Sequence, residues 1–139
     1  MRLVLDTNVV ISATLWRGPP YRLLEAVRRQ ANTVSVFASA PMLIELADVL
    51  SRPAAARRLA NISRAASDVL ADYITVAEIV EPALIQGAAP DPDDDVVIGT
   101  AVSARADQIV TGDKKLLAIG RYGQIEIVSV ADAVVRLAA

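Results

Sequence analysis

The sequence contains neither cysteine nor histidine, and this double absence excludes several classes of protein. Without cysteine there are no disulfides, no thiol catalysis and no cysteine-based zinc sites. Without histidine there is no imidazole general base, no Ser-His-Asp triad and no HExxH metalloprotease site. Any acid–base or metal chemistry must therefore use Asp, Glu, Lys, Tyr, Ser or Thr. A site made only of oxygen ligands selects hard ions such as Mg²⁺ or Mn²⁺.

Long apolar runs and aromatic residues are also scarce. No apolar stretch reaches the ~20 residues that a membrane helix needs, and Asp6 interrupts the N-terminal apolar stretch too early for a signal peptide. We therefore expect a cytoplasmic protein with no membrane segment. With one Trp, three Tyr and one Phe, few side chains are available to stack on nucleic-acid bases. Trp16 is the best placed of them, although core packing is the role that we expect for it.

The sequence does contain enough apolar residues for one folded domain. The 139 residues are 54% hydrophobic, which predicts a single domain over residues 1–139. Short apolar, β-branched runs alternate with helical patterns. We predict strands near residues 2–6, 33–37, 108–111 and 125–128, and helices near residues 7–15, 20–30, 40–52, 54–60, 63–77, 95–105, 113–119 and 130–137.

This alternation predicts an α/β fold with a central, mainly parallel sheet that is covered by helices on both faces. The predicted strands are short and apolar throughout, as expected when both faces of a sheet are buried. The segment 40–81 is mostly helical in pattern. It predicts a helical arm beside the sheet.

Two carboxylates directly follow predicted strands. Asp6 ends the first apolar run in "LVLDTNVVIS", and Asp113 follows another in "IVTGDKKLL". In a parallel sheet, sites form outside the carboxyl ends of the strands where the strand order reverses, so the two aspartates could meet there. A buried charge is costly unless it is paired, and the partner of Asp6 must come from the chain or from outside it. Each Asp also has a simpler explanation as an Asx-turn or a helix cap.

Two helical carboxylates are further candidates for the same site. In "DPDDDVVIGTAV", Asp95 adjoins an apolar run and is the acidic residue that we expect to be carried inward. Gly99, one turn on, would let that face approach the sheet closely. Asp93 and Asp94 are expected to cap the helix and face solvent. In "SAPMLIELADVL", Glu45 lies beside the apolar stripe of its helix. Taken alone, acidic residues in a first helical turn and a lone helical Glu are both commonplace.

In this order, "LVLDTNVVIS", a Glu in an early helix, "DPDDDVVIGTA" and "IVTGDKKLL" resemble the PIN domain family. The resemblance spans essentially the whole chain, and it is closest to the VapC-like toxin components of bacterial toxin–antitoxin systems. It implies a three-layer α/β/α fold and a bound Mg²⁺ or Mn²⁺. It also implies endoribonuclease activity on single-stranded or structured RNA, a cognate antitoxin protein as partner, and a homodimer.

The resemblance implies site residues as well. The acidic quartet of the family, which would carry catalysis and hold the metal, matches Asp6, Glu45, Asp95 and Asp113, with the third position open by a residue or two because Asp93 and Asp94 adjoin it. The cation would then be the partner of Asp6. Side chains that would support the quartet are Thr7, Asn8 and Thr111. Basic side chains near the catalytic edge in sequence, which are candidates for contact with the RNA backbone, are Arg17, Arg22, Lys114 and Lys115.

Two alternatives stay beside this interpretation. A phosphatase of the haloacid dehalogenase type also uses Mg²⁺ and an Asp after its first strand, but it needs a second Asp two residues on, where this chain has Asn8. A non-catalytic PIN module that binds RNA or protein would keep the fold without the activity. The intact acidic quartet argues against it.

Overall fold

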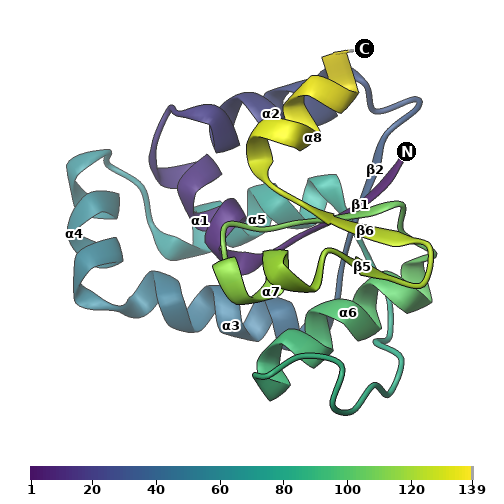
Figure 1. Ribbon diagram of the computed structural model, residues 1–139. Coiled ribbons are helices and arrows are strands. Elements are labelled where there is room, and N and C mark those ends of the chain that lie inside the picture. Colours follow the sequence, from purple (N-terminus) through teal and green to yellow (C-terminus); the bar gives the residue numbers. More distant parts are fainter. Residues whose placement is uncertain (139) are drawn as a thin grey trace.

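The computed structural model describes residues 1–138 and is built around a six-stranded sheet (Figure 1). Its strands are β1 (Arg2–Leu5), β2 (Ser35–Ala38), β3 (Ala77–Ile79), β4 (Gln108–Val110), β5 (Arg121–Tyr122) and β6 (Ile125–Val128). They lie side by side in the order β3-β2-β1-β4-β6-β5. Neighbouring strands are parallel except β5 and β6, which form an antiparallel hairpin at one edge. The expected mainly parallel sheet is confirmed.

The central strand β1 explains why the sheet is covered on both faces. Its residues Leu3, Val4 and Leu5 are each no more than 1% exposed. Successive side chains of a strand point to opposite faces, and Leu3 and Leu5 pack into one apolar cluster while Val4 packs into another with Phe37 and Ile109. A strand that is apolar at every position therefore needs a helical layer on each side.

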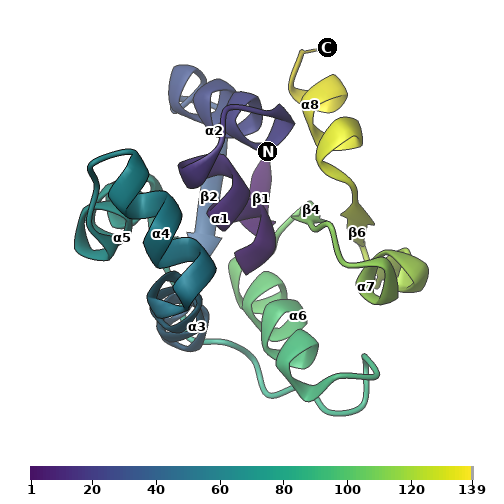
Figure 2. The same cartoon turned by 90° about the vertical axis from the view of Figure 1, so that its left-hand side faces the viewer.

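The helices in residues 1–138 are α1 (Thr7–Leu15), α2 (Pro19–Arg29), α3 (Ala40–Ser51), α4 (Pro53–Asn61), α5 (Ala66–Val76), α6 (Pro92–Ala104), α7 (Lys114–Ile119) and α8 (Val130–Ala138). Apolar side chains of α1, α2 and α8 join the cluster that contains Leu3 and Leu5, whereas those of α6 and α7 join the cluster that contains Val4. The two groups of helices lie on opposite sides of the sheet (Figure 2). The expected three-layer arrangement is confirmed. None of the helices in residues 1–138 combines the length and the apolar character that crossing a membrane requires.

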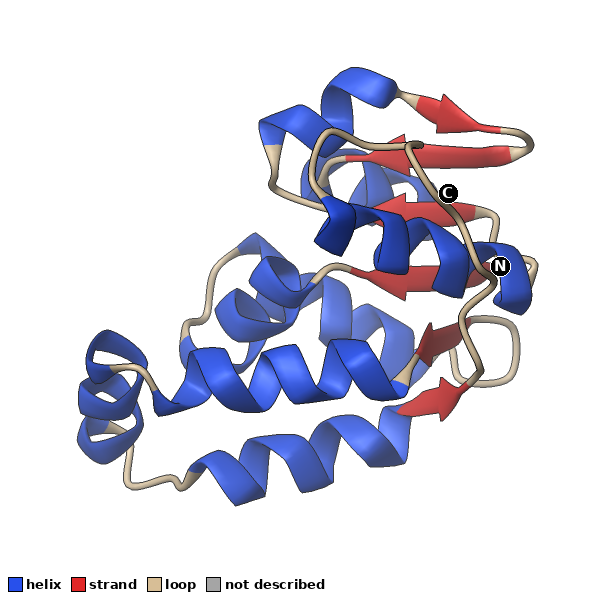
Figure 3. Cartoon of the chain, turned by 90° about the horizontal axis from the view of Figure 1, so that it is seen from below, coloured by secondary structure: helices blue, strands red, loops and turns tan. Residues whose placement is uncertain are grey.

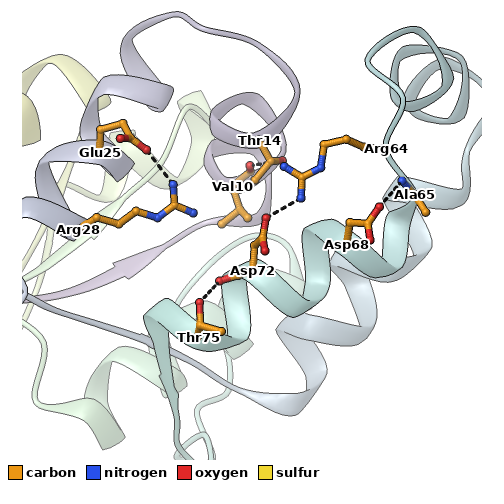
Figure 4. Close-up of polar contacts among 9 residues, drawn as sticks. All are labelled: Val10, Thr14, Glu25, Arg28, Arg64, Ala65, Asp68, Asp72 and Thr75. Atoms are coloured by element: carbon orange, nitrogen blue, oxygen red, sulfur yellow. Dashed lines mark hydrogen bonds and ion pairs between the residues drawn. The ribbon is translucent and has the colours of Figure 1, made fainter.

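The expected helical arm consists of α3, α4 and α5. Figures 1 and 3 show α4 at the end of the molecule away from β5 and β6, with α3 and α5 running between it and the sheet. Polar contacts fix the start of α5 (Figure 4). The carboxylate of Asp68 accepts a 2.8 Å hydrogen bond from the N–H of Ala65, and Arg64 pairs with Asp72. The turn from α4 into α5 is thereby held in place.

Three features differ from the elements expected from the sequence. The strands β3 and β5 were not predicted, and β3 begins at Ala77, the last residue of a predicted helix. They exist because β3 pairs with β2 and β5 pairs with β6. The helix α6 begins at Pro92 rather than near residue 95. Asp91 is its cap, because the Asp91 carboxylate accepts a 2.9 Å hydrogen bond from the N–H of Asp93, and Pro92 suits the first turn.

Candidate active site

The strand order reverses between β1 and β4, and an aspartate follows each of these strands. From β1 the sheet continues through β2 to β3 on one side, and through β4 to β6 on the other. The strands β1 and β4 are parallel, with Leu5 opposite Val110, so their carboxyl ends share one edge. Asp6 and Asp113 both lie just beyond that edge. Ligands of open α/β sheets bind at such a point.

Asp6 is only 6% exposed, yet the chain itself satisfies its carboxylate. The Oδ1 atom accepts a 2.8 Å hydrogen bond from the backbone N–H of Thr7. The Oδ2 atom accepts one of 3.2 Å from the Asn8 side-chain amide and one of 2.7 Å from the Thr111 hydroxyl. These donors replace water around the carboxylate, so an aspartate is tolerated at the end of a buried strand.

Thr111 and Asn8 also connect Asp6 to the turn that carries Asp113. The Thr111 hydroxyl is fully buried, and it accepts a 3.0 Å hydrogen bond from the N–H of Asp113 while it donates to Asp6. The Asn8 side-chain oxygen accepts a 3.1 Å hydrogen bond from the N–H of Gly112. Two polar side chains thus fix the relative position of the two strand-end aspartates.

An open cleft of about 430 Å³ lies at this edge, and we call it the acidic cleft. Helices α1, α3 and α6 and the start of α7 contribute to its walls. Thr7 and Asn8 line it from α1, and Glu45 lines it from α3. The carboxylates that line the cleft are those of Asp6, Glu45, Asp91, Asp93, Asp94 and Asp113.

Asp94, rather than Asp95, occupies the place in the site that we expect from the sequence for Asp95. Both are 9% exposed, but it is Asp94 that lines the acidic cleft. Asp95 turns toward the segment before α6, where its carboxylate accepts hydrogen bonds of 3.0 Å from the N–H of Gly87 and 2.9 Å from that of Ala89. Asp95 is buried as expected, but its carboxylate lies outside the acidic cleft, whereas the expected solvent-facing position of Asp94 is wrong. Adjacent residues of an α-helix point about 100° apart. The loop amides therefore bind the carboxylate of Asp95, while that of Asp94 points into the cleft.

Negative charge accumulates around Asp94. Its burial raises its pKa to about 6, and the charges of Asp113, Asp6, Asp91 and Glu45 contribute to the same shift. Each of these carboxylates disfavours the ionised form of its neighbours. Asp94 is therefore the residue at which the crowding of charge in the cleft is most evident.

Asp6 and Glu45 respond to the same crowding. Burial raises the pKa of Asp6, and the charge of Asp113 adds to this effect, while the hydrogen bonds to the Asp6 carboxylate oppose it. Burial also raises the pKa of Glu45, followed by the charges of Asp6 and Asp93, against a lowering effect of Arg52. The cleft thus favours a positively charged ligand.

Arg52 is the basic residue that borders the acidic cleft. Its guanidinium pairs with Asp48 at 2.9 Å, and both side chains are 63% exposed. The signal for Arg52 was its spacing, because it follows Glu45 by seven residues, or about two helical turns. The basic residues that we expect near the site lie outside the cleft, all of them exposed: Arg17, Arg22, Lys114 and Lys115.

The carboxylates suit a metal ion in chemistry but are not arranged around one. Within residues 1–138, no three acidic side chains come close enough together to hold a metal ion as they stand. Their oxygens are nevertheless the ligands that Mg²⁺ and Mn²⁺ prefer. Burial and the neighbouring carboxylates raise the pKa values of Asp6, Glu45 and Asp94, so a cation bound among them would stabilise their ionised forms. The donor set therefore fits a hard divalent cation.

Comparisons with known proteins agree with this fold. None of the curated proteins compared with the chain matches it. Among solved structures, a chain of VapBC2 from Rickettsia felis, crystallised with a DNA fragment from the promoter, is similar with a TM-score of 0.61. It is 17% identical, and the match covers 93% of this chain and 98% of that one, which shows a shared fold.

A family model of the PIN domain matches residues 2–115. The matched region contains both strand-end aspartates, Glu45 and the start of α6. The resemblance seen in the sequence motifs is thereby confirmed, and the alternative of a haloacid dehalogenase-type phosphatase is rejected. The chain belongs to the PIN domain family.

Proposed function

We propose that the protein is a metal-dependent endoribonuclease that hydrolyses phosphodiester bonds of single-stranded or structured RNA. The observation that carries this proposal is the gathering of carboxylates, with Asp6 and Asp94 buried among them, in one cleft at the switch point of the sheet. Membership in the PIN domain family supports the same activity. A bound cation would offset the burial and the charge repulsion that together raise the pKa of Asp94.

Four residues of this chain would hold Mg²⁺ or Mn²⁺: Asp6, Glu45, Asp94 and Asp113. Asp94 replaces Asp95 in the quartet, because Asp94 lines the cleft and Asp95 does not. A divalent cation supplies Lewis-acid stabilisation of phosphate charge and lowers the pKa of bound water. Thr111 and Asn8 keep the Asp6 carboxylate oriented through their hydrogen bonds. A carboxylate of the quartet accepts the proton of the attacking water, since the chain has no histidine.

The biological role that we propose is that of the toxin in a type II toxin–antitoxin pair. A solved structure with a similar fold is a VapBC2 complex bound to promoter DNA, which supports a protein partner of the antitoxin kind. In this role the protein acts on RNA in the cytoplasm, forms a homodimer, and is inhibited by a cognate antitoxin that covers the acidic cleft.

The decisive test is cleavage of single-stranded RNA in the presence of Mn²⁺ and in EDTA. We expect cleavage by the wild type only with the metal, and we expect Asp6→Asn and Asp94→Asn to abolish it. Asp132→Asn, which changes an exposed carboxylate of α8 outside the cleft, is the matched control and should keep full activity. RNA binding without cleavage at millimolar Mn²⁺ would instead identify a non-catalytic PIN module.

The toxin role has its own test. Expression of the chain alone should slow bacterial growth, and the Asp6→Asn variant should not. Growth arrest that persists in Asp6→Asn would exclude RNA cleavage as its cause.

A further inference from the structure

A second, mostly apolar groove lies next to the acidic cleft. It has a volume of about 260 Å³, and we call it the Trp16 groove. Helices α1, α3 and α4 form it, and Figure 2 shows these three helices side by side. The residues that line it are Ile11, Leu15, Trp16, Val49, Arg52, Ala54, Ala55 and Arg58.

Trp16 is exposed in this groove, contrary to the core position that we expect for it from the sequence. It keeps 51% of its surface accessible. The guanidinium carbon of Arg58 lies 4.2 Å from the centre of the Trp16 ring, and Arg58 Nε donates a 2.8 Å hydrogen bond to the carbonyl of Leu15. The guanidinium of Arg58, itself held by the Leu15 carbonyl, thus makes a cation–π contact that positions the indole without burying it. The result is a fixed aromatic surface that is open to a ligand.

The Trp16 groove and the acidic cleft form one continuous path. Ile11, Val49 and Arg52 line both of them. Along α1, Asn8 lines the acidic cleft, and Trp16, eight residues further on at the end of the helix, lines the groove. At about 1.5 Å per residue, this separation is about 12 Å. A ligand that crosses the acidic cleft therefore meets Trp16 if it continues along α1.

We propose that the Trp16 groove binds a nucleobase of the RNA substrate next to the bond that is cleaved, by stacking on Trp16, with Arg52 and Arg58 facing the flanking phosphates. This inference rests on the proposed ribonuclease function. Aromatic platforms flanked by arginine are the usual way in which proteins hold single-stranded nucleic acid without reading its sequence. The volume of the groove lies below the about 300–1,000 Å³ of pockets for drug-sized ligands, which suits a single base.

Charge favours the same occupant. A strand of RNA needs positive charge for its backbone, and the acidic cleft offers none of its own except Arg52 at its border. The ion pair of Arg52 with Asp48 is exposed, so it contributes little and can be exchanged for a phosphate contact. Arg58 supplies a second guanidinium at the same groove.

The chain has a single Trp, so its fluorescence reports on Trp16 alone. The experiment titrates a short single-stranded RNA into the Asp6→Asn variant, which cannot cleave it under the proposed mechanism. We expect the RNA to quench Trp16 fluorescence and an equally long RNA duplex to quench it much less. The same RNA with one abasic position, moved along the strand, should lose quenching at one position only.

Variants in the active background then separate stacking from structure. We expect Trp16→Ala to raise KM for RNA cleavage by about 5- to 150-fold, the usual effect of removing one stacked base partner, with kcat little changed. Trp16→Phe should restore most of the affinity, because it keeps an aromatic face. The control is Val135→Ala, which truncates an exposed apolar side chain of α8, away from the groove. Thermal melting of Trp16→Ala and Trp16→Phe shows whether either variant has lost its fold.

The outcomes are distinct. Quenching by single-stranded RNA, together with a raised KM in Trp16→Ala and its recovery in Trp16→Phe, supports the proposal. If the wild type cleaves RNA but folded Trp16→Phe and Trp16→Ala keep its KM, the groove is not a base site and the ribonuclease function stands. If Trp16→Ala keeps RNA affinity but no longer co-purifies with a co-expressed antitoxin, the groove is a protein-docking surface and the proposal is overturned. Absence of cleavage by the wild type is a failure of the proposed function, and the fluorescence titration still tests RNA binding.

Discussion

The hydroxyl of Thr111 donates a 2.7 Å hydrogen bond to the carboxylate of Asp6 across two neighbouring strands. Thr111 is fully buried and Asp6 nearly so. The same hydroxyl accepts a hydrogen bond from the N–H of Asp113. One hydroxyl therefore orients both strand-end aspartates, and its removal affects stability and activity together.

We expect Thr111→Val to lower the free energy of unfolding by about 1–3 kcal/mol, because it leaves a buried carboxylate without one of its donors. RNA cleavage should fall as well, since Asp6 loses its orientation. Urea denaturation and a cleavage assay measure the two effects. Thr111→Ser keeps the hydroxyl and should keep most of the stability and activity. Equal behaviour of the Val and Ser variants would contradict the role of the hydrogen bond.

Asp94→Asn and Asp95→Asn should change stability in opposite directions. Asp94→Asn removes a charge from the crowded cleft, so the metal-free protein should become more stable at neutral pH while cleavage is lost. Asp95→Asn weakens two hydrogen bonds to the loop amides, and we expect it to lower the free energy of unfolding by about 1–2 kcal/mol. Denaturation at pH 7 in EDTA measures the unfolding free energy of both variants and of the wild type. Loss of cleavage in Asp95→Asn alone would return Asp95 to the quartet.

The metal-free protein should lose stability as the pH rises from about 4 to about 6. The pKa of Asp94 is raised from 3.8 to about 6 in the folded protein, so the folded state holds this proton more tightly than the unfolded state does. Stability is then greatest below the unfolded pKa and falls until the folded pKa is passed. Asp6 and Glu45 act in the same direction. Thermal melts in EDTA across this range should show the decline, and Asp94→Asn should make it smaller.

A divalent cation should reverse this loss at neutral pH. A ligand that binds only the folded state stabilises it by about 2.7 kcal/mol at 100 times its dissociation constant. We expect millimolar Mn²⁺ or Mg²⁺ to raise the melting temperature at pH 7 and to raise it much less near pH 4, where the carboxylates hold protons. Zn²⁺ should have no special advantage, because the chain lacks His and Cys. A melting temperature indifferent to Mn²⁺ at pH 7 would remove the basis for a metal site in the cleft.

Gly99→Ala should destabilise the fold. A Cβ at this position would lie 2.3 Å from the carbonyl oxygen of Ala83, a backbone atom that a side-chain rotation cannot move away. Forcing the two segments apart should cost about 1–3 kcal/mol of unfolding free energy. Gly18→Ala is the control, because its Cβ would find only Pro20 Cδ at 3.9 Å. If urea denaturation gave the two variants equal stabilities, the backbone near Ala83 would have to shift at little cost to make room for the added Cβ.

Sequence patterns predict most of this fold because its main elements have local causes. The apolar run Leu3 to Leu5 predicts a strand that is buried on both faces, and the structure agrees. The two missed strands have no such cause. Two of the three residues of β3 are exposed, and β5 has only two residues, so both are formed by their partner strands rather than by their own pattern.

The site was harder to predict where distant contacts decide it. Asp6 and Asp113 were candidates because both follow strands, which the sequence does reveal, but the strand order that brings them together comes from the structure. Asp95 was expected inward from its apolar neighbours, but the amides of Gly87 and Ala89 bind its carboxylate. Gly99 likewise approaches the chain at Ala83 rather than the sheet. Neither of these contacts with the segment before α6 produces a periodic pattern of apolar residues in the sequence.

Asp95 fixes the rotation of α6 about its own axis. The amides of Gly87 and Ala89 bind the Asp95 carboxylate, and Asp94 then points into the acidic cleft in a direction about 100° away. A rotation that turned Asp94 out of the cleft would break the hydrogen bonds of Asp95. Changes in the length of the loop before α6 are therefore compatible with the site only if those amides stay opposite Asp95. The spacing from residue 87 to residue 95, more than the identity of the residues between them, is what insertions and deletions must respect.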